Sequence, residues 1–271
     1  MLKLLHASLF RLRKSRLFWL CMAAAFAVSS IFLLQIGGSE ESAWTLDEAL
    51  LQILPFLPVL YAAFIGLFLG MEYQDGTIRN KIVAGHTRGA VYLSQLITGM
   101  LGCLGILLAW ALSAVVGAVR LGWFLAPWTT QLLQLAVVVM IMAAVAGIVT
   151  LFAMLITNRA VSAVTVILAV FALLLLSSCL YNALCEPEMF SEAIMTEHGF
   201  EIGEPAPNPN YIRGTLRAVY QFFTDTLPTG QAILLANQEL AHPGLSMCAS
   251  LCVVLLTTGT GLIIFRHKDL K

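Results

Sequence analysis

Six long stretches of this 271-residue chain contain no Asp, Glu, Lys or Arg, although the whole chain has fifteen acidic and fifteen basic residues. Each stretch is at least 23 residues long; they are Leu17–Ser39, Ala49–Met71, Gly89–Val119, Leu121–Asn158, Ala160–Cys185 and Leu240–Phe265. A helix needs roughly 20 apolar residues to cross about 30 Å of bilayer hydrocarbon. A soluble domain would not tolerate six such runs, so the sequence predicts an all-α, polytopic integral membrane protein.

These runs also lack the groups that chemistry inside a membrane requires. The predicted spans are residues 17–36, 53–71, 90–119, 129–157, 160–181 and 244–265, and all five histidines lie outside them. Enzymes and ion-coupled transporters need ionisable groups at depth. The zinc-binding motif H-E-x-x-H is absent, and serines within the spans have no base beside them. An intramembrane enzyme and a proton relay are therefore disfavoured.

Motifs for binding nucleotides and metals are missing as well. A phosphate-binding loop of the form G-x-x-x-x-G-K-[ST] is absent, so any ATP that drives this protein must be hydrolysed by another chain. Five of the six cysteines lie in or beside apolar runs, where cysteine behaves as a small hydrophobic residue. Cys248 and Cys252 are four residues apart, but no His or carboxylate joins them within the run. We expect no metal, no cofactor and no nucleic-acid partner for this chain.

The basic residues between the runs are sorted by side. If the segments alternate across the membrane, twelve of the fifteen lie on the side of the N-terminus, and the exceptions are Arg120, Arg213 and Arg217. Lys and Arg near helix ends are retained on the cytoplasmic side. The pattern therefore predicts six spans with both termini in the cytoplasm, in a plasma membrane of the bacterial type.

Residues 1–16 precede the first span and are predicted to form an amphipathic elbow helix. Leu5, Leu9 and Leu12 form an apolar stripe, and basic residues occupy the opposite face. The basic residues closest to the membrane are Arg11, Arg13, Lys14 and Arg16. Such a helix lies in the membrane interface and is attracted to anionic lipid. A cleaved signal peptide is the alternative, but the following run is long enough to span the bilayer.

Two local patterns predict helix starts and contacts. Thr45, followed three residues later by Glu48, predicts a capping box at the start of a helix. Gly66 and Gly70 in the second span are spaced so that another helix can approach closely. Both patterns specify structure, and neither specifies chemistry.

The longest exposed segment, residues 182–243, is acidic and is predicted to be external. Its EPAPNP stretch, Glu204–Pro209, predicts a non-helical connector. A helical apolar face follows, at Ile212, Leu216, Val219, Tyr220 and Phe223, and Pro228 must end that helix. The stretch 231–240 is too short to span. We expect an external lid that includes Phe223, Pro228 and Gly230; packing against the outer rims of the spans is the alternative.

The segment Glu72–Gly89, EYQDGTIRNKIVAGHTRG, is the densest polar stretch on the predicted cytoplasmic side. Asp75 or Thr77 can cap a short helix there, and Gly85 suits its C-terminal end. The charged residues Arg79 and Lys81 are expected to project away from its apolar edge. A short helix across two spans suits docking into a partner's groove, whereas a solvated loop is the plain alternative.

This segment also carries a family resemblance. The E-x-x-x-G-T-I run at Glu72–Ile78, with Thr87–Arg88 ten residues on, resembles the permease subunits of ABC transporters. The class is the six-helix type 2 permeases (type V exporters, similar to the ABCG fold), and Leu227–Gly230 resembles a stretch before their last span. In that family this loop is the coupling helix that contacts the ATPase. The resemblance assigns Glu72, Gly76, Thr77 and Arg88 to that contact by motif, and Arg79 and Lys81 by position. Gln95 stands where the family frequently has a basic residue.

The resemblance implies one transmembrane permease domain over residues 1–271, forming half of the pathway of an ATP-driven exporter. A second copy or a related permease would complete the pathway, and separate ATP-binding subunits would hold ATP and Mg²⁺. The lipid bilayer is the remaining partner. The alternative function is a non-transport membrane sensor or assembly component that binds a ligand through the acidic external loop.

Overall fold

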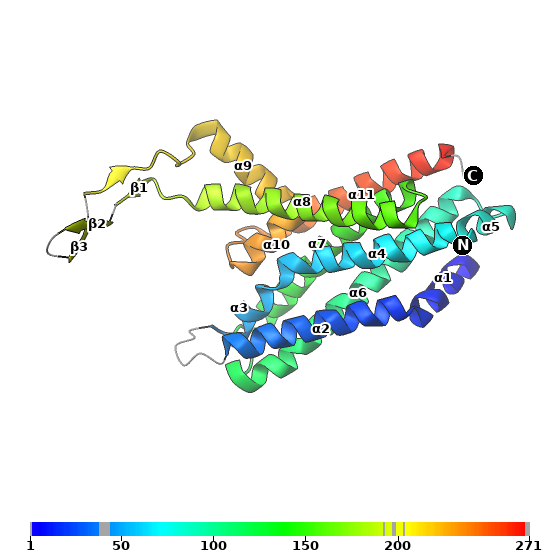
Figure 1. Ribbon diagram of the computed structural model, residues 1–271, viewed down its shortest axis with the longest axis horizontal. Helices are drawn as coiled ribbons and strands as arrows, with labels where there is room; N and C mark the ends of the chain where they lie inside the picture. Colours follow the sequence, from blue (N-terminus) through cyan, green and yellow to red (C-terminus); the bar gives the residue numbers. More distant parts are fainter. Residues whose placement is uncertain (1, 38–43, 192, 197–198, 203, 269–271) are drawn as a thin grey trace.

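A computed structural model shows a bundle of long helices with both ends of the chain on the same side (Figure 1). The structure describes residues 2–37, 44–191, 193–196, 199–202 and 204–268. In this part of the chain, six helical stretches are long and apolar enough to cross a membrane. They are α2 (Arg16–Ile36), the composite stretch Leu46–Gln74, α6 (Arg88–Leu121), α7 (Trp128–Leu155), α8 (Arg159–Cys185) and α11 (Pro243–His267). The prediction of an all-α, six-span protein is confirmed.

The second of these stretches is not one continuous helix. It consists of α3 (Leu46–Leu51), a 3₁₀ turn η1 (Leu54–Phe56) and α4 (Leu57–Gln74). Pro55 and Pro58 fall at the two junctions, where their missing backbone N–H groups need no helical partner. The predicted capping box is confirmed, because Thr45 Oγ1 accepts from the Glu48 amide while Glu48 Oε2 accepts from the Thr45 amide.

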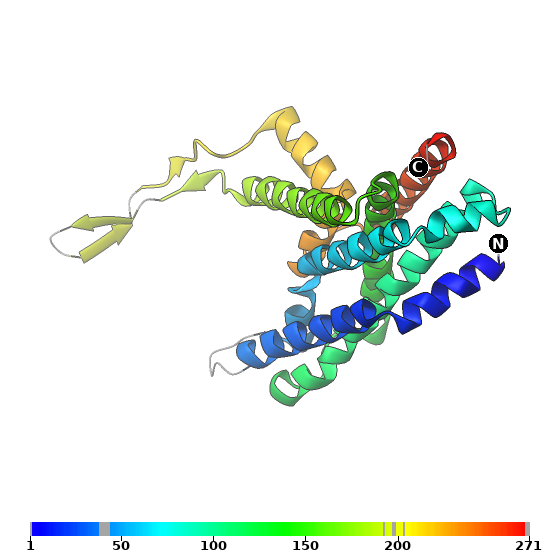
Figure 2. The same ribbon diagram turned by 45° about the vertical axis from the view of Figure 1, so that its right-hand side comes forward.

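The bundle has two ends, at which different elements lie (Figures 1 and 2). We call one the α5 end; it holds α1 (Leu2–Lys14), α5 (Thr77–Val83), the α7–α8 turn and the end of α11. The opposite end, which we call the α9 end, holds α3, the α6–α7 turn and the segment between α8 and α11. The segments that charge sorting placed on one side therefore do gather at one end of the molecule.

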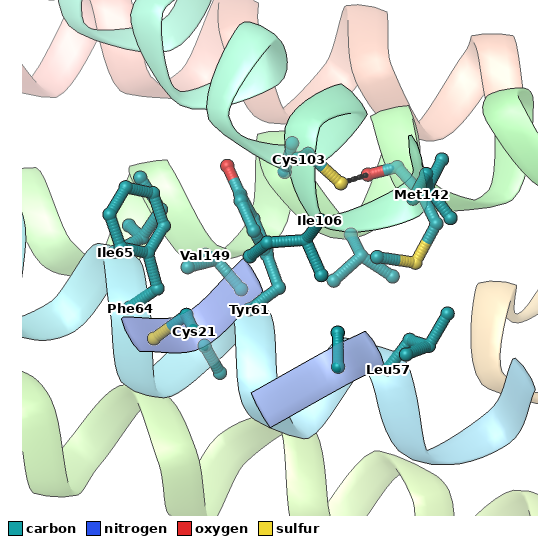
Figure 3. Close-up of a cluster of buried hydrophobic side chains, with 14 of the residues drawn as sticks. Cys21, Leu57, Tyr61, Phe64, Ile65, Cys103, Ile106, Met142 and Val149 are labelled. Atoms are coloured by element: carbon teal, nitrogen blue, oxygen red, sulfur yellow. Dashed lines mark hydrogen bonds between the residues drawn. The ribbon is translucent and has the colours of Figure 1, made fainter. Parts of the chain in front are cut away.

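The interior is packed around close helix pairs, chiefly α2 with α6, α4 with α8, and α7 with α11. A Cβ on Gly66 would lie 2.8 Å from Ala163 Cα, so α4 and α8 meet at this glycine, as the spacing predicted. Figure 3 shows part of the core, where Tyr61 of α4, Ile106 of α6 and Val149 of α7 gather. The Cys103 thiol there lies 3.8 Å from the Met142 carbonyl oxygen.

The segment between α8 and α11 contains strands that the sequence did not predict. Strand β1 (Met189–Phe190) pairs antiparallel with β4 (Ala206–Pro207), and β2 (Ala193–Thr196) pairs antiparallel with β3 (Gly199–Ile202). These paired strands extend away from the helices in both views (Figures 1 and 2). Two helices follow, α9 (Gly214–Thr226) and α10 (Pro228–Ala236). The predicted amphipathic helix is thus present, while the EPAPNP connector lies partly in β4.

Candidate functional site

The chain reverses sharply between α4 and α5, at the α5 end. Gly76 has a φ of 65°, in the left-handed region that a residue with a Cβ rarely adopts, and it occupies the N-cap position of α5. The structure therefore contradicts the expectation that Asp75 or Thr77 caps this helix, because both side chains bind elsewhere. Gly85, with a φ of 89°, follows the end of α5 as predicted.

Glu72, in the last turn of α4, is fully buried at this corner. Its Oε2 accepts hydrogen bonds from Lys81 Nζ at 2.7 Å and from Gln95 Nε2 at 2.9 Å. Its Oε1 lies 3.5 Å from Arg11 Nη1. A buried carboxylate is stable only where cations and donors surround it. Here they come from three other helices: α1, α5 and α6.

Further contacts extend the arrangement around Glu72. Arg11 Nη1 donates to Thr77 Oγ1 at 3.1 Å, and its Nη2 pairs with Asp75 Oδ2 at 3.0 Å. Lys81 Nζ also reaches Ser8 Oγ at 3.4 Å. We call the whole set the Glu72 cluster: Ser8, Arg11, Glu72, Asp75, Thr77, Lys81 and Gln95. Its two cations and two carboxylates balance, so displacement of α5 cannot leave α1, α4 and α6 unaffected without exposing a charge.

The inward face of the N-terminal helix overlaps the predicted apolar stripe, since Leu12 is buried and Leu9 packs against the core while partly buried. Leu4, Ser8 and Leu12 are its buried residues, and α1 packs against α6. Arg11, expected on the outer basic face, points instead into the Glu72 cluster. The other basic residues of the predicted elbow, Arg13, Lys14 and Arg16, are exposed. Their contact with lipid stays a prediction.

The residues predicted in the coupling loop divide between the interior and the surface. Glu72 is buried, and Thr77 and Lys81 are partly buried, their side chains bonded within the cluster. Arg79, by contrast, is exposed together with Asn80 and Val83, whose exposed fraction is 79%. These three residues form what we call the outward face of α5. It is an exposed part of the loop.

Arg88 lies apart from the cluster, at the start of α6. Its Nη1 donates to the carbonyl oxygens of Arg266 and Lys268, so it holds the end of α11. Lys268 Nζ in turn donates to Met154 O at 2.8 Å and to the Tyr73 hydroxyl at 3.1 Å. Burial lowers the pKa of Lys268 from 10.5 to about 8. This C-terminal clasp joins α4, α6, α7 and α11 beside the Glu72 cluster.

The three residues expected in an external lid are not alike. Phe223 on α9 is 46% exposed, whereas Pro228 and Gly230 are buried at the start of α10. A Cβ on Gly230 would lie 2.3 Å from the Thr224 carbonyl oxygen, so only glycine allows α9 and α10 to meet so closely. Pro228 and Gly230 therefore build a corner, and Phe223 is the one of the three on the surface.

Sequence reasoning did not assign Ser8, Gln95 or Lys268 to a site. Gln95 carried a signal, since an amide stands where the family often has a basic residue, and here it donates to a carboxylate. Ser8 lies on the same face as Leu4 and Leu12, at helical spacing. Lys268 carried no signal, because its partners come from α4 and α7 and lie far away in the sequence.

The described residues include no group of three or more His, Cys, Asp or Glu side chains that could hold a metal ion. All six cysteines are free. The charged residues of the Glu72 cluster are held by one another, so the cluster joins helices and does not present a nucleophile or base to a substrate. The described structure is thus a six-span helical bundle of the membrane-protein class, with a charged corner beneath an exposed helix.

Comparison with known families agrees with this class. The model of the ABC-2 family transporter proteins matches residues 4–177, from α1 to the second half of α8, so the chain belongs to that family. No match was found among curated proteins. The chain is therefore a multi-pass membrane protein and the permease component of an ABC transporter. Permeases of this family generally lack an ATPase site of their own, and membership implies association with an ATP-binding subunit.

Proposed function

We propose that this protein forms half of the translocation pathway of an ATP-driven exporter. A second permease, either another copy or a related chain, supplies the other half. Two ATP-binding subunits hold ATP and Mg²⁺ and hydrolyse ATP. The α5 end faces the cytoplasm of a bacterial-type cell, and the α9 end faces outward. Export as the direction of transport follows from the resemblance to six-helix exporters.

The Glu72 cluster is the observation that supports coupling through α5. The outward face of α5 carries Arg79 and Val83, and the inward face carries Thr77 and Lys81, which bond to Glu72. A partner that moves the outward face therefore moves α4 and α6 through a buried ionic contact. Arg11 adds α1 to the same unit. In this proposal α1 and α5 move together when the ATP-binding subunits close.

Copurification from the native host tests the proposal. The wild-type protein should bring down an ATP-binding subunit, and the double variant Arg79→Glu, Val83→Glu should lose it, because both side chains are exposed. Arg120→Glu is the matched control, since it reverses an exposed charge at the α9 end. Lys81 is left unchanged because its bond to Glu72 is internal.

The outcomes separate the two candidate functions. If the wild-type protein is isolated stably with no ATP-binding subunit, a sensor or assembly component is favoured and the exporter proposal fails. If the ATP-binding subunit remains bound to the double variant, the docking surface lies elsewhere on the α5 end. Loss of the subunit from Arg120→Glu would show that the loss is not specific to α5.

A further inference from the structure

A cavity of about 320 Å³ lies at the α9 end, between α8, α9, α10 and the start of α11. Leucines from four different parts of the chain line it; they are Leu184, Leu234, Leu240 and Leu245. Its polar lining includes Asp225 on α9 and Glu239 and His242 in the α10–α11 connection. The cavity therefore combines apolar walls with carboxylates. The helices α9 and α10, which line it, lie at the opposite end of the bundle from α5 (Figure 1).

Buried hydrogen bonds fix the walls of this cavity. Gln231 is fully buried, and its Nε2 donates to Asp225 O at 2.8 Å and to Ser246 O at 3.2 Å. Its Oε1 accepts from Ser250 Oγ at 2.7 Å. Gln231 thus holds α9, α10 and α11 together and sets the position of the Asp225 backbone. A site whose supporting groups are locked in this way is formed before a ligand arrives.

Another tie joins α10 to α8. The Thr229 hydroxyl lies 2.7 Å from Ser177 Oγ and 3.1 Å from the Leu173 carbonyl oxygen. The three side chains Ser177, Thr229 and Gln231 are all buried. The α8 wall of the cavity is therefore fixed relative to α10 by contacts that lie outside the cavity itself.

The arginine that lines the cavity, Arg217, forms no ion pair with its acidic groups. Arg217 Nη2 donates to the Leu184 carbonyl oxygen at 3.0 Å, and its guanidinium lies 5.1 Å from the centre of the Tyr211 ring. The ion pairs found among the described residues do not include Asp225 or Glu239. Burial raises the pKa of the Asp225 carboxyl, and the nearby charge of His242 partly opposes this shift. Asp225 and Glu239 thus line one cavity together with Arg217 and His242, and neither carboxylate is held in an ion pair with Arg217.

We propose that this cavity is a binding site for an amphiphile that carries a primary ammonium group. The ammonium binds between Asp225 and Glu239, and the apolar part lies against the four leucines. This inference does not rest on the proposed exporter function, because it concerns binding to the isolated permease. The same chemistry occurs in soluble amphipathic amines and in the headgroup of phosphatidylethanolamine, and the experiment distinguishes these two sources.

Binding of octylamine to the full chain in phosphatidylcholine nanodiscs tests the site, with partitioning into empty nanodiscs subtracted. Octanol and octanoate share the chain length and lack the cation. We expect thermophoresis to show saturable binding of octylamine alone. Asp225→Asn with Glu239→Gln should weaken it on the order of tenfold or more, since both carboxylate charges of the cavity are lost. Glu188→Gln is the matched control, because Glu188 pairs with Arg213 outside the cavity.

A second variant keeps the test decisive if the double variant folds poorly. Ala241 lines the cavity and is exposed, so Ala241→Trp should fill the space and abolish octylamine binding without touching the buried ties. Equal binding of octylamine by the wild type and both variants, or equal binding of octanoate and octylamine by the wild type, would overturn the proposal. Phosphatidylethanolamine in the nanodiscs should lower the octylamine affinity if the lipid headgroup is the occupant, and leave it unchanged if a soluble amine is.

Discussion

The two ends of the bundle are held together by different kinds of contact. At the α5 end, a buried carboxylate, Glu72, is surrounded by Lys81, Arg11 and Gln95. Among α8, α9, α10 and α11 at the α9 end, the buried ties are neutral; the amide of Gln231 and the hydroxyls of Thr229 and Ser250 join these four helices. Asp225 and Glu239 line a cavity between these helices, and Asp47 on α3, which is buried, accepts hydrogen bonds from the backbone amides of Leu125 and Ala126.

This difference indicates different mechanical roles: the helices at the α5 end are coupled by charges, and the helices at the α9 end are held in a fixed shape. A buried charge network has a strong preference for one arrangement, because separating Lys81 from Glu72 leaves the buried carboxylate without its nearest cation. Neutral hydrogen bonds and the close packing at Gly230 hold a fixed shape without a buried charge. The α5 end is therefore suited to transmit a displacement as a unit, and the α9 end is suited to keep a cavity open at fixed size.

Removal of the carboxylate should have the largest effect on stability. Glu72→Ala leaves Lys81 and Arg11 without their buried counter-charge, so we expect a loss of about 3–5 kcal/mol in unfolding free energy. Thermal unfolding of the purified protein in detergent measures this loss. Glu72→Leu combined with Lys81→Leu should recover much of it, because a buried ion pair can be replaced by apolar residues at little net cost. A Glu72→Ala variant that unfolds like the wild type would show that the Glu72 cluster does not hold these helices together.

The stability of the α9–α10 corner should depend on side-chain size and not on charge. In Gly230→Ala the new Cβ would lie 2.3 Å from the Thr224 carbonyl oxygen, which is backbone and cannot rotate away. We expect a loss of about 1–3 kcal/mol, by the rule for overpacked interiors. Gly244→Ala is the control, since a Cβ there meets no atom within 4 Å. Similar unfolding midpoints for both variants would contradict the tight α9–α10 corner.

The smallest expected effect is a pH response of the clasp at the α5 end. The pKa of Lys268 is lowered from 10.5 to about 8, so between these values the folded tail binds fewer protons than the unfolded tail. The clasp should therefore strengthen as the pH rises from about 8 to 10.5, and be weakest and constant below about 8. A spin label at Arg266→Cys should become less mobile over that range. Lys268→Gln should remove the response, and a label that becomes more mobile would reverse the assigned sign.

Much of the architecture was predictable because it depends on the alternation of apolar runs and charged segments along the sequence. Apolar runs bounded by charges gave the six spans, and Thr45 with Glu48 gave the helix start. The break at Pro55 and Pro58 was missed, since hydropathy alone does not distinguish a 3₁₀ turn from a helix. The short paired strands were missed because segments of two to four residues leave too little periodicity to recognise.

The candidate site was only partly predictable, because its partners are distant in sequence. The motif identified Glu72 and Thr77, but periodicity placed Arg11 on the outer face of α1, whereas it pairs with Glu72 more than sixty residues away. Lys81 was expected to project toward a partner, and it bonds inward for the same reason. Amphipathic patterns report polarity along one helix and do not report a buried carboxylate on the neighbouring one.

The distance between α5 and α1 during the ATP cycle tests most directly whether the Glu72 cluster makes these two helices move together. Spin labels replace Val83 and Phe10, which are both exposed, in a variant whose native cysteines are substituted, and the permease is assembled with its ATP-binding subunit. We predict that a trapped ATP state leaves the Val83–Phe10 distance unchanged while the distance from Val83 to a label at Trp123 changes. Glu72→Gln should make the first distance vary with nucleotide. A Val83–Phe10 distance that already varies in the protein with Glu72 intact would contradict the account.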